Sequence, residues 1–235
     1  MDGVLARCQK SAKPLAVILA GHNGSGKSTL WCKHLSDIFQ IPLINADRIM
    51  LSILPEPDAK QRLSDWATDL RDKNPEWMWI AQKGVGSFVD HALKAKVPFA
   101  VETVFSHWKE HADGRVESKI DWIKKYQRSG YFVLLLFVGL TSVEMSIARV
   151  KTRKELGGHG VALGKLRERF PRTQKAVRHA LLVADAALLI DNSFSMDTPF
   201  PLCRAQFGDE IVYDCRDAAS PPPAIINWMK CVCPK

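Results

Sequence analysis

The fold is decided by the stretch Leu15-Ala16-Val17-Ile18-Leu19-Ala20, which runs directly into Gly21-His22-Asn23-Gly24-Ser25-Gly26-Lys27-Ser28-Thr29. The first part is a short continuous apolar run, which is typical of a strand buried within a parallel sheet. The second part matches the phosphate-binding pattern Gly-x-x-x-x-Gly-Lys-Ser, and residues 30–39 after it have a helical pattern. A strand before the loop and a helix behind it are the context in which this motif binds nucleotides. We therefore predict a nucleoside triphosphate site at residues 21–29.

The residue types in this loop have separate chemical roles. Glycines allow the backbone to curl so that successive N–H groups point at phosphate oxygens, and the positive end of the following helix strengthens that field. In this pattern Lys27 reaches the β- and γ-phosphates, and the hydroxyl of Ser28 is a magnesium ligand. The loop thus predicts a nucleotide and Mg²⁺ as cofactors.

Strand and helix patterns alternate along most of the chain. Further strand-like apolar runs lie at 41–44, 98–101, 131–138 and 186–190, and helical patterns lie at 60–72, 76–95, 116–128, 142–156 and 164–183. Pro171 is expected to break the last of these helices or to begin its second piece. The alternation predicts an α/β fold of three layers, α/β/α, like that of P-loop kinases, with a mainly parallel sheet of about five strands or slightly more.

The domain organisation follows from where this alternation stops. Residues 1–194 are expected to form one P-loop kinase domain. Prolines interrupt the pattern after residue 195, so we interpret 195–235 as a C-terminal appendage and not as an independent domain.

Composition restricts the class of protein. Of 235 residues 46% are hydrophobic and 25% charged, which excludes disordered, collagen-like and coiled-coil proteins. The longest apolar run, 131–140, is too short to span a bilayer, no secretory signal is recognisable, and the six cysteines are scattered. We therefore expect a cytoplasmic protein with no membrane partner. Its net charge of +8 favours anionic partners, either nucleic acid or small phosphorylated molecules.

The function of a P-loop protein depends on the residues at its other strand ends. The GTPase tetrapeptides Asn-Lys-x-Asp and Asp-x-x-Gly do not occur, and the strand most like that of a motor ATPase, 188–191, ends in one acid followed by Asn192. Instead, Asp47 and Glu102 follow the next two predicted strands along the chain. Ligands of open parallel sheets lie at the carboxyl ends of the strands, so both acids should face the γ-phosphate. This pattern favours a kinase.

The two acids are assigned different roles. Asp47 is the predicted base for the acceptor hydroxyl, and the alternative is a helix N-cap. Glu102 is expected to hold a substrate hydroxyl or a magnesium-bound water. The alternative for Glu102 is a strand-end charge that is solvated or paired with a lysine.

Phosphoryl transfer also requires cations around the transferred group. Arg149 and Arg153 are four residues apart in a predicted helix and therefore share a face. A second group, Arg167, Arg169 and Arg172, follows His159, which lies between glycines. One interpretation is a lid that carries arginines onto the phosphates, with His159 contacting substrate or phosphate. The other is a solvated basic surface.

Several segments in order carry a family resemblance: residues 20–29, Asn45-Ala46-Asp47, Val101-Glu102-Thr103, the spaced pattern from Arg149 to Val161 that includes Gly157-Gly158-His159, and residues 184–193. Together these segments resemble the zeta toxin family of P-loop kinases over about residues 14–194. The chain departs from the family pattern at His22 and Ala162, where proline is common.

The resemblance implies ATP-dependent phosphorylation of a sugar hydroxyl, with UDP-N-acetylglucosamine as the acceptor, and a toxin–antitoxin role with an antitoxin protein as partner. It implies that Lys27 binds phosphate, that Asp47 is the catalytic base and that Glu102 and Thr103 bind substrate. Arg149 or Arg153 matches a phosphate-stabilising arginine.

The sequence as a whole therefore predicts a kinase that moves the γ-phosphate of ATP to a hydroxyl of a small acceptor, best a UDP-activated amino sugar. The alternatives are a kinase for nucleic-acid ends or another small molecule, and a regulatory P-loop ATPase. The residues expected to bind the acceptor are Asn45, Glu102, Thr103, His159, Arg167 and Arg169.

Overall fold

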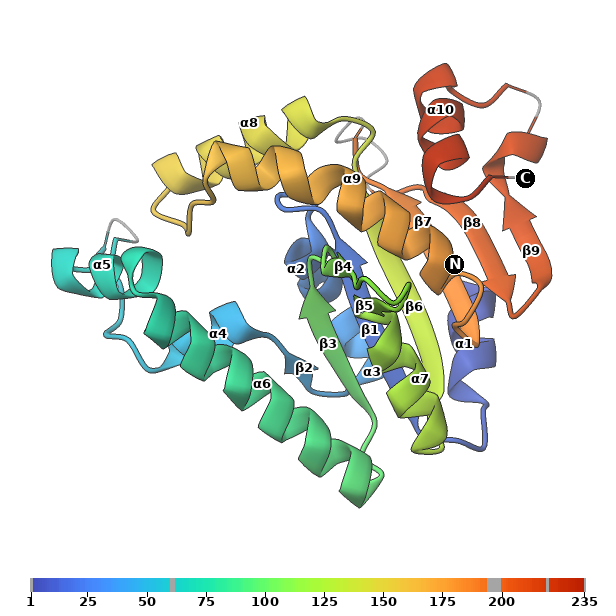
Figure 1. Ribbon diagram of the computed structural model, residues 1–235, viewed down its shortest axis with the longest axis horizontal. Helices are drawn as coiled ribbons and strands as arrows, with labels where there is room; N and C mark the ends of the chain where they lie inside the picture. Colours follow the sequence, from blue (N-terminus) through green and yellow to red (C-terminus); the bar gives the residue numbers. More distant parts are fainter. Residues whose placement is uncertain (1, 60–61, 194–199, 219, 235) are drawn as a thin grey trace.

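Seven strands form the central sheet of the computed structural model, which describes residues 2–59, 62–193, 200–218 and 220–234. The strand order is β2-β3-β1-β6-β7-β8-β9; the first five strands in this order are parallel and the last two are antiparallel. The strands are β1 (Leu15–Gly21), β2 (Leu43–Ile44), β3 (Phe99–Thr103), β6 (Phe132–Gly139), β7 (Ala186–Asp191), β8 (Leu202–Phe207) and β9 (Glu210–Asp214). The predicted α/β class with a mainly parallel sheet is confirmed, and β8 and β9 extend that sheet (Figure 1).

Helices cover both faces of the sheet, because successive residues of a buried strand point to opposite sides. Ala16 and Ile18 of β1 belong to a core cluster with four helices, whereas Val17 and Leu19 belong to a second cluster on the other face. The first cluster includes α6 (Pro75–Ala95), α7 (Ile120–Arg128), α9 (Leu163–Ala180) and α10 (Pro223–Val232). The second includes α1 (Asp2–Gln9), α2 (Lys27–Leu30), the π-helix η1 (Trp31–Leu35) and α3 (Ser36–Phe39).

The remaining helices are α4 (Ala46–Ser52), α5 (Asp65–Lys73), α8 (Val143–Glu155) and the short 3-10 helix η2 (Cys215–Asp217). Pro171 lies inside α9, which continues through it, so the predicted break at this residue is wrong. A proline in a helix removes one backbone hydrogen bond. Here buried residues on either side of Pro171 make tertiary contacts that hold the helix: Phe170 stacks on His22, and Thr173 donates to the carbonyl oxygen of Val104. None of the helices in the described ranges is long and apolar enough to cross a membrane.

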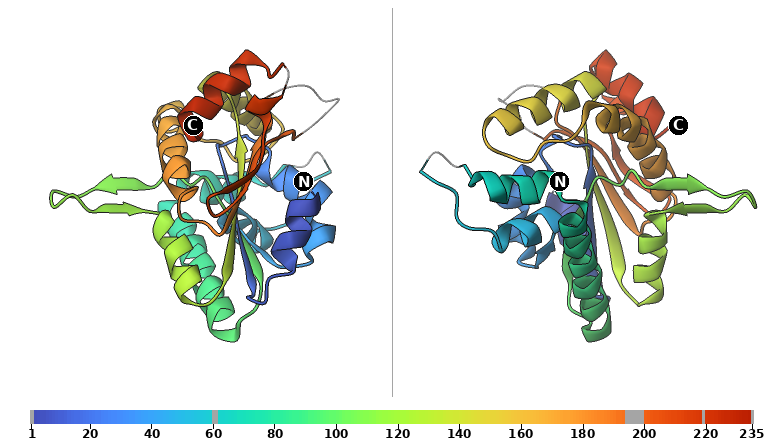
Figure 2. Two further views of the ribbon diagram at one scale, coloured as in Figure 1. Left: turned by 90° about the vertical axis from the view of Figure 1, so that its right-hand side faces the viewer. Right: turned by 60° about the vertical axis from the view of Figure 1, so that its left-hand side comes forward.

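A two-stranded hairpin projects from the body of the molecule, as both views of Figure 2 show. It consists of β4 (Trp108–Glu110) and β5 (Val116–Ser118), which are antiparallel. The helix predicted over 116–128 therefore begins only at Ile120, because its first residues pair with β4. The turn residues Asp113 and Gly114, the latter at a φ of 81°, are the hairpin signal that helical periodicity alone overlooks.

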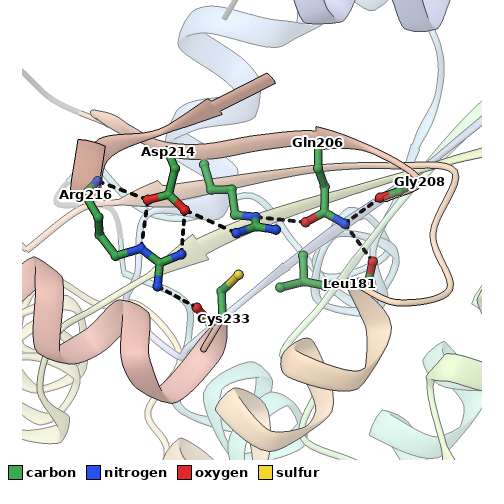
Figure 3. A network of polar contacts seen from close by, with 7 residues as sticks. Leu181, Gln206, Gly208, Asp214, Arg216 and Cys233 are labelled. Atoms are coloured by element: carbon green, nitrogen blue, oxygen red, sulfur yellow. Dashed lines mark hydrogen bonds and ion pairs between the residues drawn. The ribbon is translucent and has the colours of Figure 1, made fainter. Parts of the chain in front are cut away.

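The C-terminal region is anchored to the sheet at two places. The side chain of Trp228 in α10 lies directly on Gly139 at the end of β6, where a Cβ would come within 2.0 Å of the indole ring. Farther along, Asp214 accepts hydrogen bonds from Arg216, which also donates to the carbonyl oxygen of Cys233 (Figure 3). Arg204 of β8 donates to the same carboxylate, so these contacts tie β8, β9, η2 and α10 together.

Candidate active site

The phosphate-binding loop follows β1 and leads into α2, as its sequence predicts. Gly26 is the residue before α2 and has a φ of 86°, a conformation that glycine adopts without strain. Lys27 is buried, and its Nζ donates hydrogen bonds to the carbonyl oxygens of Gly21 at 3.2 Å and His22 at 2.9 Å. Burial lowers the pKa of Lys27, and the carboxylates of Glu102 and Asp47 oppose that shift. Both predicted acids therefore lie close enough to act on Lys27.

Ser28 and Glu102 are in direct contact. The Ser28 hydroxyl lies 3.0 and 3.1 Å from the two carboxylate oxygens of Glu102, and Nδ2 of Asn45 donates to Oε2 of Glu102 at 2.7 Å. Carboxylate and hydroxyl oxygens are the donors that Mg²⁺ prefers. The oxygens of these two side chains thus fit a magnesium ion, held directly or through water next to the phosphates.

Asp47 lies in the first turn of α4 and is exposed. The N-cap of this helix is Asn45, whose Oδ1 accepts hydrogen bonds from the backbone N–H groups of Asp47 and Arg48. The capping role considered for Asp47 is therefore filled by Asn45. The Asp47 carboxylate has no structural partner of its own in the described residues and stays available on the side of Lys27.

The two arginines of α8 occupy different places. Arg153 lies close enough to Lys27 for its charge to lower the Lys27 pKa, and its Nε is buried without a hydrogen-bond partner in the described part of the chain. Arg149 packs on the loop itself, with its Cβ only 3.1 Å from where a Cβ of Gly24 would lie, and its charge reaches Asp191. Of the two arginines, Arg153 is therefore the one whose charge acts on Lys27.

His159 contacts an acid on a distant helix. Its Nδ1 lies 2.8 Å from Oδ1 of Asp72 in α5, and Arg71, which also binds Asp72, donates to the carbonyl oxygen of Gly157 at 3.0 Å. Burial alone would raise the pKa of Asp72, but hydrogen bonds from Arg71 and His159 hold that pKa below its usual value. The structure thus places His159 in a bridge between α5 and the loop that joins α8 to α9, which the sequence did not indicate.

The three arginines of the second group, Arg167, Arg169 and Arg172, have different surroundings. Arg172 is paired with Glu168 one turn earlier in α9, and Arg167 is exposed. Arg169 is partly buried and lies close enough to Lys119 for its charge to lower the Lys119 pKa. Lys119, which no motif singled out, donates a hydrogen bond to Oγ1 of Thr103 at the end of β3.

His22, which stands where proline is common in the family pattern, has a packing role in the loop. It is buried, its Nδ1 accepts a hydrogen bond from the N–H of Leu140, and its ring stacks on Phe170 at 3.9 Å. Burial lowers the pKa of His22 to about 3, so the imidazole is neutral. This residue therefore joins the loop to α9 and carries no charge toward phosphate.

On the far side of the loop, Asn192 follows β7 and its Nδ2 donates to the carbonyl oxygen of Ser25 at 2.8 Å. Asp191 is fully buried, and its carboxylate accepts hydrogen bonds from both the backbone N–H and the hydroxyl of Ser193. These contacts make the end of β7 a support for the loop, a role different from the paired acids of a motor ATPase.

The fold and this loop define the class of the protein: it is a P-loop protein of the kinase type, with the nucleotide site at the carboxyl end of a parallel sheet. Comparison with known families is more specific. The family model described as Zeta toxin matches residues 2–187, and the chain belongs to that family. It is accordingly a nucleotide-binding phosphotransferase.

Individual relatives agree with this assignment. A protein of unknown role from Haemophilus influenzae is 30% identical over 155 residues, which cover 66% of this chain and 91% of that protein. Among solved structures, AvrRxo1-ORF1:-ORF2 with ATP is similar with a TM-score of 0.60 and 14% identity, covering 99% of this chain and 68% of that one. The PezAT toxin–antitoxin structure from Streptococcus pneumoniae has a TM-score of 0.55 and 16% identity, covering 100% and 85%. At these identities the structural likeness concerns the fold.

Proposed function

We propose that this protein transfers the γ-phosphate of ATP to a hydroxyl group of UDP-N-acetylglucosamine or a closely related UDP-activated amino sugar. The observation that carries the proposal is the arrangement of two carboxylates, Asp47 and Glu102, around Lys27 and Ser28 of the phosphate-binding loop. A kinase needs one acid for the acceptor and one for the metal side. Asp47 follows β2, and Glu102 lies in the last residues of the neighbouring strand β3.

In this mechanism the oxygen of the acceptor hydroxyl forms a bond to the γ-phosphorus, and Asp47 accepts the proton of that hydroxyl. The bond between that phosphorus and the β,γ-bridging oxygen breaks, and ADP leaves with the bonding electrons. Lys27 and Arg153 stabilise the charge that spreads over the transferred group. Mg²⁺, when bound at Ser28 and Glu102, would neutralise the β- and γ-phosphate oxygens.

The partners and the compartment belong to the same proposal. Solved structures with this fold include a toxin–antitoxin pair, and the family is that of the zeta toxins, so we expect an antitoxin protein to bind this chain in the cytoplasm. The ATP in the AvrRxo1-ORF1:-ORF2 structure supports ATP as the nucleotide here.

The test uses Asp47→Asn, which removes the base and keeps the size of the side chain. This variant should bind a non-hydrolysable ATP analogue like the wild type but transfer phosphate at least about 100-fold more slowly, since general-base catalysis contributes that much or more. Transfer is measured with γ-labelled ATP and a panel of UDP-sugars, free sugars, nucleosides and RNA with 5′-hydroxyl ends.

Asp37→Asn is the matched control, because Asp37 is also an exposed aspartate in the first turn of a helix, α3. It should transfer phosphate at the wild-type rate. Full activity of Asp47→Asn would reject the base, and labelling of RNA ends in place of UDP-sugars would reject the acceptor. Steady phosphate release with no labelled acceptor would indicate a regulatory ATPase instead.

A further inference from the structure

Lys119 is a cation at the edge of the phosphate site that belongs to none of the sequence motifs. It lies between β5 and α7, and its ammonium group donates a hydrogen bond to Oγ1 of Thr103. Thr103 directly follows Glu102, whose carboxylate contacts the hydroxyl of Ser28. The hairpin and the start of α7 therefore bring a positive charge to the carboxyl end of β3.

The surroundings of this ammonium group are positive. Within the described residues, Lys119 has no acidic partner: its side chain contacts Thr103 and the ring of Trp122, whose centroid is 4.6 Å from Nζ. Burial, followed by the charges of Arg169 and Lys27, lowers the pKa of Lys119 to about 8. Two partly buried cations that repel each other, as Lys119 and Arg169 do, are stabilised when an anion binds between them.

The position of Lys119 indicates which anion this is. Lys27 is assigned to the ATP phosphates, and Arg149 and Asn192 contact the loop from the α8 and β7 side. Lys119 approaches from β3, which pairs with β2, the strand that leads to Asp47. It therefore lies on the side where the acceptor hydroxyl must enter.

Arg169 is held at the same place by its helix. Thr173, one turn later in α9, donates a hydrogen bond to the carbonyl oxygen of Val104 at 3.2 Å, and Phe170 stacks on His22. These two contacts fix the middle of α9 between the loop and the end of β3. Arg169, whose charge acts on Lys119, thus belongs to a part of α9 that is held in place by buried packing.

We propose that Lys119, together with Arg169, binds an anionic phosphate or diphosphate group of the acceptor, which makes Lys119 a specificity-determining residue. This inference rests on the proposed function, because it requires an acceptor other than water. It explains how the site would prefer a nucleoside-diphosphate sugar over the free sugar carrying the same hydroxyl group.

The first test measures KM for the acceptor. Lys119→Met keeps an apolar side chain over Trp122 and removes the charge, whereas Lys119→Arg keeps the charge. The control, Lys124→Met, removes an exposed charge from α7, the helix that begins directly after Lys119. We expect Lys119→Met to raise KM for UDP-N-acetylglucosamine at least about tenfold, because a charge-assisted contact is lost, while KM for ATP stays unchanged. Lys119→Arg should bring KM for UDP-N-acetylglucosamine most of the way back to the wild-type value, and Lys124→Met should have the wild-type KM.

Free N-acetylglucosamine separates a diphosphate contact from a general defect. Its KM should be the same in wild type and Lys119→Met, since this sugar has no anionic group. Two results would overturn the proposal and place Lys119 on the transferred phosphate. One is a higher KM for ATP in Lys119→Met, and the other is an equal rise in KM for both sugars.

The second test is independent of turnover and measures binding by calorimetry. Protein saturated with Mg²⁺ and the β,γ-imido analogue of ATP is titrated with UDP and, separately, with uridine. The wild type should bind UDP more tightly than uridine, and Lys119→Met should reduce that ratio at least about tenfold. An unchanged ratio, or no UDP binding to the wild type, would overturn the inference.

The two proposals can fail separately. If the UDP preference depends on Lys119 but no UDP-sugar is phosphorylated, the proposed acceptor is wrong and the anion site remains. If UDP-N-acetylglucosamine is phosphorylated with the same KM by wild type and Lys119→Met, the proposed function remains and the role of Lys119 is wrong.

Discussion

At the scale of single residues, charge placement distinguishes side chains that look equivalent in the sequence. Arg149 and Arg153 are one helical turn apart, yet only Arg153 lies with a buried, unpartnered Nε and a charge that acts on Lys27. Arg149 instead packs its stem on Gly24. Because a buried donor without a partner in the described residues is costly, we expect the Nε of Arg153 to donate to a phosphate oxygen when nucleotide binds.

This difference predicts unequal effects of two substitutions. Arg153→Ala should lower kcat for ATP consumption about 100-fold or more, since it removes a cation that stabilises the transferred group. Arg149→Ala should lower kcat less than about fivefold and act mainly on KM for ATP, because Arg149 supports the loop. Steady-state measurement of ADP release gives both constants, and an equal loss of kcat in the two variants would contradict the assignment.

At the scale of elements, the site depends on helices that are tied together from a distance. Asp72 of α5 bridges to His159 behind α8, and His22 of the loop stacks on Phe170 of α9. Farther back, α10 covers the end of β6 through Trp228, which also stacks on Phe137. These contacts join α5 to the segment between α8 and α9, α9 to the phosphate-binding loop, and α10 to the end of β6.

The contact between α10 and β6 makes Gly139 intolerant of a side chain. Gly139→Ala should lower the free energy of unfolding by about 1–3 kcal/mol, because its Cβ would overlap the indole of Trp228. Urea unfolding measures this, and Gly86→Ala, at an exposed position of α6 with open space, should instead be neutral or stabilising.

The same substitution in a Trp228→Ala variant tests whether the indole ring is the cause. In Trp228→Ala protein, Gly139→Ala should lower the free energy of unfolding much less than it does in the wild type, since the overlapping ring is gone. Equal costs in the two backgrounds would show that Gly139 is required for another reason.

At the scale of the whole molecule, the antiparallel strands β8 and β9 join the C-terminal region to the parallel sheet. Asp214 is the centre of this junction, because its buried carboxylate accepts hydrogen bonds from Arg204 and Arg216. Burial alone would raise the pKa of Asp214, but the hydrogen bonds and charge of Arg216 together with Arg204 lower it to about 2. The folded protein therefore favours the ionised form more strongly than the unfolded chain does.

A pH dependence of stability follows from this shift. The folded pKa lies below the unfolded value of 3.8, so the contribution is present above about pH 4 and is lost as the pH falls through about 2. At pH 7 Asp214→Asn should be less stable than wild type by about 2 kcal/mol or more, and this difference should shrink as the pH approaches 2.

Urea unfolding at several pH values measures the difference in stability between Asp214→Asn and the wild type. The control is Asp69→Asn, at an exposed aspartate paired with Lys73, which should show no such difference. A stability difference for Asp214→Asn that stays constant down to pH 2 would contradict the assigned pKa.

Local patterns predicted the parts of the fold and site that neighbouring residues encode. These parts are the apolar run of β1, the loop after it, the acid after β2 and the acid at the end of β3. Each is a short segment whose chemistry needs no distant partner. The errors occur where distant pairing overrides the pattern, as when residues 116–118 join β4 and delay the start of α7. Pro171 likewise stays within α9 because buried neighbours hold it.

The sequence by itself determined that this chain is a P-loop protein with an acid at the end of each of two neighbouring strands, because motif spacing and strand ends are local properties of the backbone. Only the tertiary structure decided that the charge of Arg153 acts on Lys27, that His159 pairs with Asp72, and that Lys119 reaches Thr103. The contact of Lys119 with Thr103 joins residues 16 apart, and the contact of His159 with Asp72 joins residues 87 apart. Their existence depends on how helices and the hairpin pack against the sheet, which no periodicity within one segment records.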